Sequence, residues 1–459
     1  MQETKIVDPA SFRDPSGFVF TQQGVLYRQV QDSYRGQYER LIGSGLYKEL
    51  VECELMVAHE EANPAPALGE SAYRILRPER IPFLSYPYEW SFSQLKDAAL
   101  LTLEIQKRSL QHGMVLKDAA AYNIQFLRGR PVLIDTLSFE HYKEGEPWVA
   151  YGQFCRHFLA PLALMAHKDI RLNQLFRIFI DGIPLDLAAS LLPFGTRFKV
   201  SLMTHIHLHA RSQKHYERKT ISRNRYRISL YQFRALMDSF ETAVRKLNWR
   251  PEGTEWGDYY ECTNYSGDSL ECKKQIVREF IRNYRPETVW DLGANTGLFS
   301  RIASDEGCYT VSFDIDPAAV EKNYRHVRQS REVNLLPLLA DLSNPSPGLG
   351  YANRERMSFE QRGPAGAILA LALIHHMAIS NNVPLRKIAE YFSTLAGLLM
   401  IEFVPKNDSQ VQRLLSTRED VFPQYTQDHF EQEFGRFFNI KSSVRVSGSE
   451  RTLYLMQKR

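Results

Sequence analysis

The stretch that decides the fold of the C-terminal half is residues 289–300, which read VWDLGANTGLFS. Its apolar start predicts a buried strand, its end predicts the first turn of a helix, and two glycines lie between them. A phosphate-binding P-loop needs a lysine directly after its last glycine, but Leu298 follows Gly297. A dinucleotide-binding turn needs a glycine where Asn295 stands. The remaining pattern is Asp-x-Gly-x-Asn-x-Gly, from Asp291 to Gly297.

Strands and helices alternate around this turn. A helix is expected over 268–284 before it, and another over 317–329 after it. Further apolar strand patterns lie at 310–316, 335–341, 365–376 and 397–405. Such alternation predicts a doubly wound α/β sheet with parallel strands. At the C-terminus, NIKSSVRV and RTLYLMQKR flank the turn SGSE, which predicts a β-hairpin whose last strand runs antiparallel to the rest.

Two acidic residues stand at the ends of the strands that follow the glycine turn. Asp314 lies near the end of TVSFDID, where a carboxylate can accept hydrogen bonds from both ribose hydroxyls of a nucleoside. Asp341 ends LLPLLAD, where its carboxylate or the adjacent backbone can face the amine of adenine. Ligands of open α/β sheets bind at the carboxyl ends of the strands, so these acids and the turn are expected to converge.

With these motifs, residues 250–459 resemble the class I S-adenosylmethionine-dependent methyltransferases. The resemblance implies a Rossmann-like domain with a mostly parallel seven-stranded sheet and an antiparallel last strand. It also implies S-adenosylmethionine as cofactor and a methyl acceptor whose reacting atom, oxygen or nitrogen, stays open. The residues expected to bind the cofactor are Asp291, Gly293, Asn295, Gly297, Asp314 and Asp341.

The segment that corresponds to the family's fourth strand reads LALALIHHM and carries His375 and His376. Many family members have Asn/Asp-Pro-Pro-Tyr there, so the chain departs from the signature of adenine and glutamine methylation. A hydroxyl or amine acceptor benefits from proton removal, and imidazole suits that task near neutral pH. We therefore expect one of the two histidines to act as general base or to orient the acceptor, with Glu402 as a further candidate.

The front half contains a second chemical pattern, in residues 112–139. Asp118 and Asn123 stand five residues apart in a loop, and Asp135 ends the apolar run PVLID. Phosphoryl transfer needs one aspartate to orient the attacking hydroxyl, and an asparagine and a second aspartate to hold magnesium. The stretch resembles the protein-kinase-like fold, in particular its aminoglycoside-phosphotransferase-like branch. The resemblance implies an α+β kinase-like domain with Asp118 as the catalytic aspartate.

This front half departs from the kinase pattern in several places. No glycine-rich phosphate loop is present, no strand lysine is identified, and Thr136-Leu137 follows Asp135. The domain is therefore either a pseudokinase that presents the acceptor or an active kinase. Only in the active case would Asn123 and Asp135 hold magnesium with bound ATP. A plain helix–loop–strand segment, whose Asp and Asn side chains cap turns, is the structural alternative.

The domain boundaries follow from these assignments. We expect a kinase-like domain over 1–204, a basic linker or helical connection over 205–250, and the methyltransferase domain over 251–459. Residues 211–227 carry seven Lys or Arg and one acidic residue, a run typical of a solvated linker or of a contact with an anionic glycan or small molecule. His205, His207 and His209 alternate, so in a strand they would share one face.

Composition narrows the remaining classes. A net charge of +4 over 459 residues does not indicate nucleic-acid binding, and neither a signal peptide nor a membrane span is expected. Five scattered cysteines indicate a reducing cytoplasm rather than zinc or disulfides. The organisation resembles bacterial nodulation-related methyltransferases. Three alternatives stay open: a non-catalytic cofactor-binding regulator, a bifunctional kinase-methyltransferase acting on a glycan or small molecule, and a Rossmann-type oxidoreductase.

Overall fold

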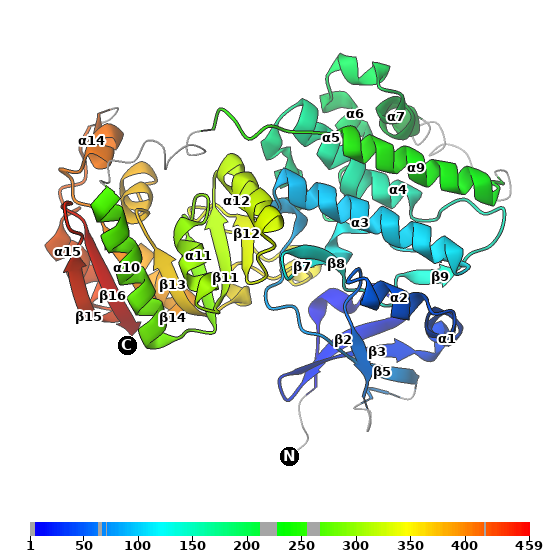
Figure 1. The fold of residues 1–459 in the computed structure, drawn as a ribbon, viewed down its shortest axis with the longest axis horizontal. Coiled ribbons are helices and arrows are strands. Elements are labelled where there is room, and N and C mark those ends of the chain that lie inside the picture. The colour runs from blue at the N-terminus through cyan, green and yellow to red at the C-terminus, as the bar shows by residue number, and fades with distance from the viewer. Residues whose placement is uncertain (1–4, 63–66, 70, 212–226, 255–266, 417–418) are drawn as a thin grey trace. The chain divides into compact units, whose positions relative to one another are not determined.

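The computed structural model describes residues 5–62, 67–69, 71–211, 227–254, 267–416 and 419–459 (Figure 1). The chain forms two compact units. The first comprises Met1–Trp249 together with Leu349–Arg356, and the second comprises Arg250–Gly348 together with Met357–Arg459. Among the described residues, no helix combines the length and the hydropathy needed to cross a membrane.

The first unit begins with a five-stranded antiparallel sheet in the order β1-β2-β3-β5-β4. Its strands are β1 (Ile6–Val7), β2 (Gly17–Gln22), β3 (Val25–Gln31), β4 (His59–Glu61) and β5 (Ala72–Pro78). The strand–turn–strand pattern expected near the start of the chain is present, because Gln23 and Gly24 turn between β2 and β3 with positive φ. Helices α1 (Arg35–Gly43) and α2 (Leu46–Glu52) lie between β3 and β4 in the chain.

The rest of the first unit is mainly helical around α3 (Phe92–Gln111), which lies beside α9 (Leu230–Lys246) (Figure 1). The Ser91 hydroxyl and the Gln94 side chain cap the start of α3 reciprocally. Two small hairpin-like sheets follow, β6 (Met114–Leu116) with β9 (Phe139–His141) and β7 (Ile124–Leu127) with β8 (Arg130–Leu133). The remaining α-helices are α4 (Tyr151–Phe154), α5 (Ala160–His167), α6 (Leu185–Leu191) and α7 (Val200–Leu202).

The segment predicted to join the domains is helical over residues 205–211 and over α9, and it belongs to the first unit as far as Trp249. Helix α9 is amphipathic and buries Phe233, Met237 and Phe240 on one face. This helix is therefore packed against the protein and is not a solvated linker. The alternating histidines do not share the face of a strand, because His205 and His207 lie in the π-helical segment η8 (Met203–Leu208). The His205 ring packs on Phe240. Its Nδ1 atom lies within hydrogen-bond distance of the Tyr151 hydroxyl oxygen, at 2.8 Å.

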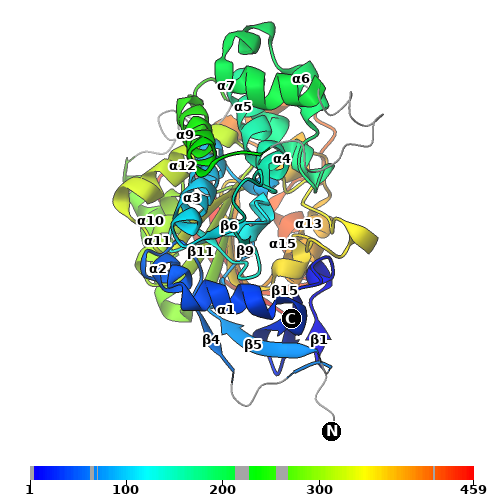
Figure 2. The same cartoon turned by 90° about the vertical axis from the view of Figure 1, so that its right-hand side faces the viewer.

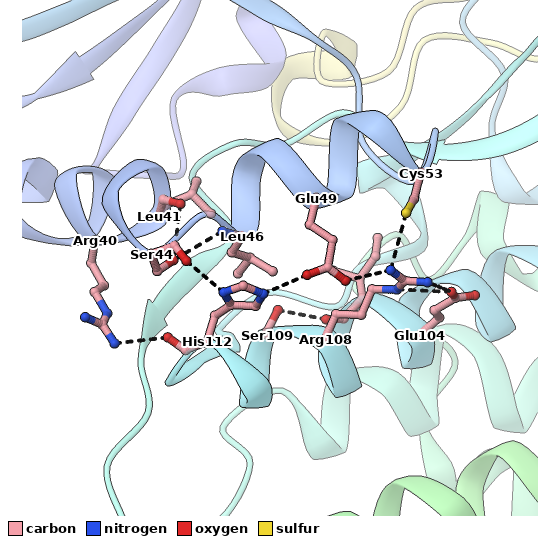
Figure 3. Close-up of polar contacts among 11 residues, drawn as sticks. Arg40, Leu41, Ser44, Leu46, Glu49, Cys53, Glu104, Arg108, Ser109 and His112 are labelled. Carbon is pink, nitrogen blue, oxygen red and sulfur yellow. Dashed lines mark hydrogen bonds and ion pairs between the residues drawn. The ribbon is translucent and has the colours of Figure 1, made fainter.

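A polar cluster joins α1 and α2 to the end of α3 (Figure 3). The ring nitrogens of His112 lie 2.9 Å from the Ser44 carbonyl oxygen and 2.7 Å from a Glu49 carboxylate oxygen. The other Glu49 oxygen accepts a hydrogen bond from Arg108 at 2.6 Å. Arg108 also donates to Glu104, one turn earlier on α3. The cluster therefore fixes the helices that follow β3 against the long helix α3.

Leu349–Arg356 belongs to the first unit although it follows β12 of the second in sequence. The guanidinium of Arg13 donates two hydrogen bonds to the Glu355 carboxylate, at 2.8 and 2.9 Å. The next residue, Arg356, lies over the ring of Tyr122 at 4.1 Å from its centroid. Because the Glu355 side chain is buried, the paired geometry of the Arg13 fork is what keeps its charge satisfied.

The second unit is built on a seven-stranded sheet in the order β12-β11-β10-β13-β14-β16-β15 (Figure 1). Its strands are β10 (Thr288–Leu292), β11 (Tyr309–Asp314), β12 (Leu335–Leu339), β13 (Ala365–Ala370), β14 (Ala396–Phe403), β15 (Phe438–Arg445) and β16 (Thr452–Lys458). Strands β10 to β14 pair in parallel, and β16 pairs antiparallel with both β14 and β15. The predicted doubly wound sheet and its antiparallel terminal hairpin are therefore confirmed.

Helices connect the parallel strands as the alternating pattern predicted. They are α11 (Leu298–Asp305), α12 (Pro317–Ser330) and α13 (Leu385–Leu395), whereas α10 (Gly267–Tyr284) precedes β10, and α14 (Ser409–Leu415) and α15 (Gln427–Phe434) lie between β14 and β15. Chain order runs outward from β10 to β12 and then returns to β13 on the other side of β10. The direction of winding therefore changes between β10 and β13, which is where open α/β sheets form ligand crevices.

Candidate functional site

A cavity of about 290 Å³ opens at the carboxyl ends of the central strands of the second unit. It lies where the direction of winding changes, and it takes residues from β10, β11, the segment after β12 and the segment after β13. The predicted site residues that line it are Asp291, Gly293, Asn295, Asp314, Asp341 and His376. Gly297, His375 and Glu402 are not among its lining residues.

The turn after β10 is held in a conformation that its glycines permit. Gly293, Asn295 and Gly297 all have positive φ, at 77°, 50° and 81°. A Cβ atom on Gly297 would lie 2.6 Å from Asn323 Nδ2, so this glycine is required for packing beneath the turn. Gly293 instead lines the cavity, where a Cβ atom would meet the side chain of Leu373 at 3.2 Å. The two positions therefore require glycine for different reasons: Gly297 for packing beneath the turn, and Gly293 for space beside the cavity.

The Asp314 carboxylate connects the ends of β10 and β11. Its Oδ2 accepts a hydrogen bond from the Asn295 backbone at 2.7 Å, and its Oδ1 accepts one from the Asp316 backbone at 2.8 Å. Burial raises the pKa of Asp314 to about 6, and the backbone hydrogen bonds from Asp316 and Asn295 oppose that rise. A carboxylate has about four acceptor positions, so two positions are left beyond these backbone donors.

Asp291 plays a different part, at the end of β10. Its Oδ2 accepts a 2.6 Å hydrogen bond from the Ser300 hydroxyl on α11, which ties the strand to the helix across the turn. Burial raises its pKa to about 7, while Ser300 and the nearby Lys273 ammonium oppose the rise. Asp341 is less buried, and its Oδ1 accepts hydrogen bonds from the backbone and hydroxyl of Ser343.

Lys273 on α10 also lines the cavity, and the sequence analysis missed it. Its ammonium donates to Glu402 Oε2 at 2.6 Å within a buried ionic network. Arg451 extends the network, because its guanidinium donates to Asp408 at 2.7 and 3.0 Å and lies 3.9 Å from Glu402. A signal was present in the sequence, since Lys273 stands at helical spacing between apolar Leu270 and Val277.

Glu402 was expected to be a base for methyl transfer, and the structure places it among buried charges. Its side chain is fully buried, with 0% exposed surface. It is engaged by Lys273 and lies beside Arg451 at the end of β14. Glu402 is therefore part of a buried ionic network and lies outside the lining of the cavity, and its expected role as a base stays a prediction.

The two histidines lie in a helix and not at the end of a strand, which corrects the expected strand over 365–376. Strand β13 ends at Ala370, and Ala372 then adopts a positive φ of 52°. That bend starts a helical turn in which His375 precedes the π-helical segment η13 (His376–Ser380). Only His376 lines the cavity, because the helical turn directs His375 into the core.

Burial governs the protonation of both rings. Burial and the nearby Arg451 lower the pKa of His376 to about 4, so the ring is neutral near pH 7. The pKa of His375 is also lowered, by burial first and then by His376. The Nδ1 atom of His375 is buried without a hydrogen-bond partner among the described residues. The ring centroids lie 4.2 Å apart.

The predicted phosphoryl-transfer residues lie close together in the first unit. Asp118 accepts hydrogen bonds from the Ala120 backbone at 2.9 Å and from Gln153 at 2.7 Å. Burial, followed by the charge of Asp135, raises the pKa of Asp118. The Asn123 side chain hydrogen-bonds to Asp118 and also donates to the Ser138 hydroxyl at 3.3 Å.

Asp135 has a cationic partner that the sequence analysis did not identify. Arg28 on β3 lies 2.5 Å from Asp135 Oδ1, and both side chains are largely buried. The Leu137 backbone also donates to Oδ1, and the Ser138 hydroxyl donates to Oδ2. A divalent cation would have to displace this guanidinium, so the arrangement does not fit the expected magnesium at Asn123 and Asp135. Among the described residues, no group of three or more His, Cys, Asp or Glu side chains could hold a metal ion.

The sheet order, the antiparallel β16 and the cavity at the switch point define the second unit as a Rossmann-like α/β domain. The chain as a whole belongs to the family of the nodulation protein NoeA of Rhizobium meliloti (strain 1021). The two are 35% identical over 463 residues, which cover 98% of this chain and 95% of that relative. No protein-family model matches the chain.

Several solved structures are similar to part of the chain. Magnesium protoporphyrin IX methyltransferase (ChlM) from Synechocystis PCC 6803, solved with bound SAH, is 15% identical, with a TM-score of 0.32, and covers 44% of this chain and 93% of its own. The N-methyltransferase NodS from Bradyrhizobium japonicum WM9 is 10% identical, with a TM-score of 0.31, and covers 42% and 98%. WbdD, crystallised with a kinase inhibitor, is 13% identical, with a TM-score of 0.28, and covers 41% and 40%.

Proposed function

We propose that the chain is an S-adenosylmethionine-dependent methyltransferase that acts on a hydroxyl or amine acceptor. One observation carries the proposal: the Asp314 carboxylate lies at the end of β11 in a cavity at the switch point, with acceptor positions beyond its two backbone hydrogen bonds. The glycine turn brings backbone to the same cavity. These features fit a nucleoside-bearing cofactor with two ribose hydroxyls.

Each lining residue then has a role. Asp314 would accept hydrogen bonds from the ribose hydroxyls, Asp341 would face the adenine amine, and Gly293 with Asn295 would bring the backbone close to the methionine part. Asp291 and Gly297 support the turn through Ser300 and Asn323. The bound cofactor would supply an activated methyl group, so the protein's main task is to position the acceptor and exclude water.

His376 is the residue that we assign to the acceptor. It lines the cavity, and its low pKa keeps the ring neutral and able to accept a hydrogen bond from a hydroxyl or amine. A ring with this pKa is a weak base at pH 7, which favours orienting the acceptor over removing its proton. His376→Ala is expected to leave the binding of S-adenosylhomocysteine unchanged and to lower methyl transfer, whereas loss of cofactor binding would contradict this role.

Calorimetric titration of the full chain tests the proposal. S-adenosylhomocysteine should bind and NAD⁺ should not, because Asn295 replaces the glycine that lets a pyrophosphate approach. Asp341→Ala should weaken the binding about tenfold, since it removes one hydrogen bond to a charged group. Asp305→Ala is the matched control, because that carboxylate is exposed at the far end of α11. Binding of NAD⁺ instead would favour an oxidoreductase, and binding of neither would refute the proposal.

We propose further that the first unit is kinase-like and recognises the acceptor. Its sheet order β1-β2-β3-β5-β4, with helices between β3 and β4, supports this, as does the cluster of Asp118, Asn123 and Asp135. Kinases place a lysine on their third strand, and Arg28 on β3 is the cation beside Asp135 here. Arginine cannot be exchanged for lysine at a phosphate site without changing the geometry. The unit therefore suits recognition better than phosphoryl transfer.

Titration of the full chain with ATP, with and without magnesium, separates the remaining possibilities. A recognition unit gives no magnesium-dependent binding, and Arg28→Lys does not create it. Magnesium-dependent ATP binding that is lost in Asp135→Ala would instead favour a bifunctional kinase-methyltransferase. If S-adenosylhomocysteine binds but His376→Ala changes no reaction of any acceptor, a non-catalytic regulator in the cytoplasm becomes the better account. The basic run at 211–227, proposed to meet an anionic acceptor, lies outside the described residues except for Arg211 and Arg227.

A further inference from the structure

Helices α13 and α15 lie side by side in the second unit (Figure 2). A second cavity of about 500 Å³ is lined by residues at the start of each of these helices. Its volume is within the range of small-molecule sites. Residues of the loop before α13 form one side, and residues 421–425 with the first turns of α15 form the other. None of the residues predicted from the sequence as site residues lines it.

The cavity contains a buried acidic group with an unused oxygen. Glu433 lines it, and the Glu433 side chain is only 8% exposed. Its Oε1 pairs with Arg436 at 3.2 Å, but Oε2 is buried without a hydrogen-bond partner among the described residues. Leaving a buried acceptor unsatisfied is costly, and the cost is larger when the group is charged. The carboxylate therefore calls for a donor that the described part of the chain does not supply.

The residues around Glu433 indicate what kind of molecule would donate a hydrogen bond to its Oε2 atom. His429 lies one turn before Glu433 on the same face of α15, and Phe422 and Pro423 give the opposite wall an apolar surface. Pro384 and Leu385 extend the apolar surface at the start of α13. A ligand with an apolar body and one hydroxyl or ammonium group fits this combination.

The second cavity adjoins the first through a single short helix. Met377 and Ser380 of η13 line the cofactor cavity, whereas Ala378 of the same segment lines the second cavity. A ligand held against Glu433 is thus separated from the candidate cofactor cavity by one helical turn that also carries His376. The arrangement links the two spaces through one element that both ligands would contact.

We propose that this second cavity binds a small hydroxyl- or amine-bearing molecule whose donor group hydrogen-bonds to Glu433, at a site distinct from the one where methyl transfer occurs. Its coupling to the cofactor cavity rests on the proposed methyltransferase function. The element that couples the two sites is η13, because Ala378 lines the second cavity while His376 and Met377 line the first. Glu433 is therefore a binding residue for a second ligand and not for the group that accepts the methyl.

Ligand-observed NMR on the full chain tests this inference with three probes of one shape: benzylamine, benzyl alcohol and benzoate. Benzylamine or benzyl alcohol should give saturation transfer, and whichever binds more tightly identifies the donor class. Benzoate should give none, because two carboxylates would face each other. Glu433→Gln should weaken the better probe at least tenfold, and Asp428→Asn, an exposed change on the same helix, should leave it unchanged.

Further measurements keep the outcome decisive. If Glu433→Gln lowers the thermal midpoint of unfolding, Val421→Trp is used as the test variant instead. Val421 is 62% exposed and lines the cavity, so a larger side chain there should block entry of the probe without altering the core. S-adenosylhomocysteine is titrated on the same samples. Probe binding that depends on Glu433 and changes at least twofold when S-adenosylhomocysteine saturates the chain supports the inference.

The failures are also distinguishable. S-adenosylhomocysteine binding without any probe binding that depends on Glu433 overturns the inference and leaves the proposed function standing, with only water satisfying Glu433. Probe binding that depends on Glu433 in a chain that does not bind S-adenosylhomocysteine supports the second ligand site and overturns the proposed function together with the coupling between the two cavities.

Discussion

Replacing Asp314 by asparagine tests the candidate cofactor site most directly. The change preserves the shape of the side chain but removes its charge and one of its two acceptor oxygens. In the structure both oxygens already accept backbone hydrogen bonds, at 2.7 and 2.8 Å, so the two positions left for ribose hydroxyls are those of a charged acceptor. Hydrogen bonds to charged groups contribute about 1.5–3 kcal/mol each. The variant loses the hydrogen bond to one oxygen and makes the other a neutral one, which costs at least about 2 kcal/mol, or about thirtyfold in affinity.

The assay is calorimetric titration of S-adenosylhomocysteine at pH 7.5, with Asp305→Asn as the control carboxylate on the same unit. A pH series adds an internal check. The pKa of Asp314 is about 6, so protonation below that pH removes the charge, and the affinity of the wild-type chain should fall as the pH is lowered from 7.5 to 5. The variant should lose most of this pH dependence. A folded Asp314→Asn chain that binds within about threefold of wild type would show that the carboxylate does not contact the ligand.

Three further predictions concern the stability of the second unit. Gly297→Ala should lower the free energy of unfolding more than Gly307→Ala does, as measured by denaturant unfolding. Both glycines have positive φ, which alone costs an alanine about 1–2 kcal/mol, but only at Gly297 would the new Cβ atom meet Asn323. Lys273→Met should lower the free energy of unfolding by about 3–5 kcal/mol, because it leaves Glu402 buried without its ammonium partner, and adding Glu402→Leu should recover part of that loss. The folded-state pKa of Asp291, about 7, is above its ordinary 3.8, so its contribution to stability is fully present below about pH 4 and is lost as the pH rises toward 7. Asp291→Asn should therefore flatten the fall of the thermal midpoint between pH 5 and 8, and an unchanged slope would contradict the buried, protonated state.

The sequence predicted the architecture of the second unit well, because parallel strands with buried faces leave continuous apolar runs and the connecting helices keep a regular period. It failed after Ala370, where the apolar run continues to Ile374 but the chain bends at Ala372 into a helix. An apolar run by itself does not distinguish a strand from a buried helical turn. In the first unit, histidines that alternate in sequence belong to a π-helical segment for the same reason.

For the candidate site, the sequence by itself determined which strand ends carry the glycine turn and the acidic residues. These features are local, because a short motif that follows a strand specifies the backbone of the turn at that strand's end. Tertiary structure decided which side chains meet. Arg28 comes to Asp135 across the sheet, and Lys273 comes to Glu402 from a helix that precedes β10. Glu433 lines a cavity made of segments about fifty residues apart in the chain. Such contacts depend on packing between distant elements, and no local pattern in the chain records them.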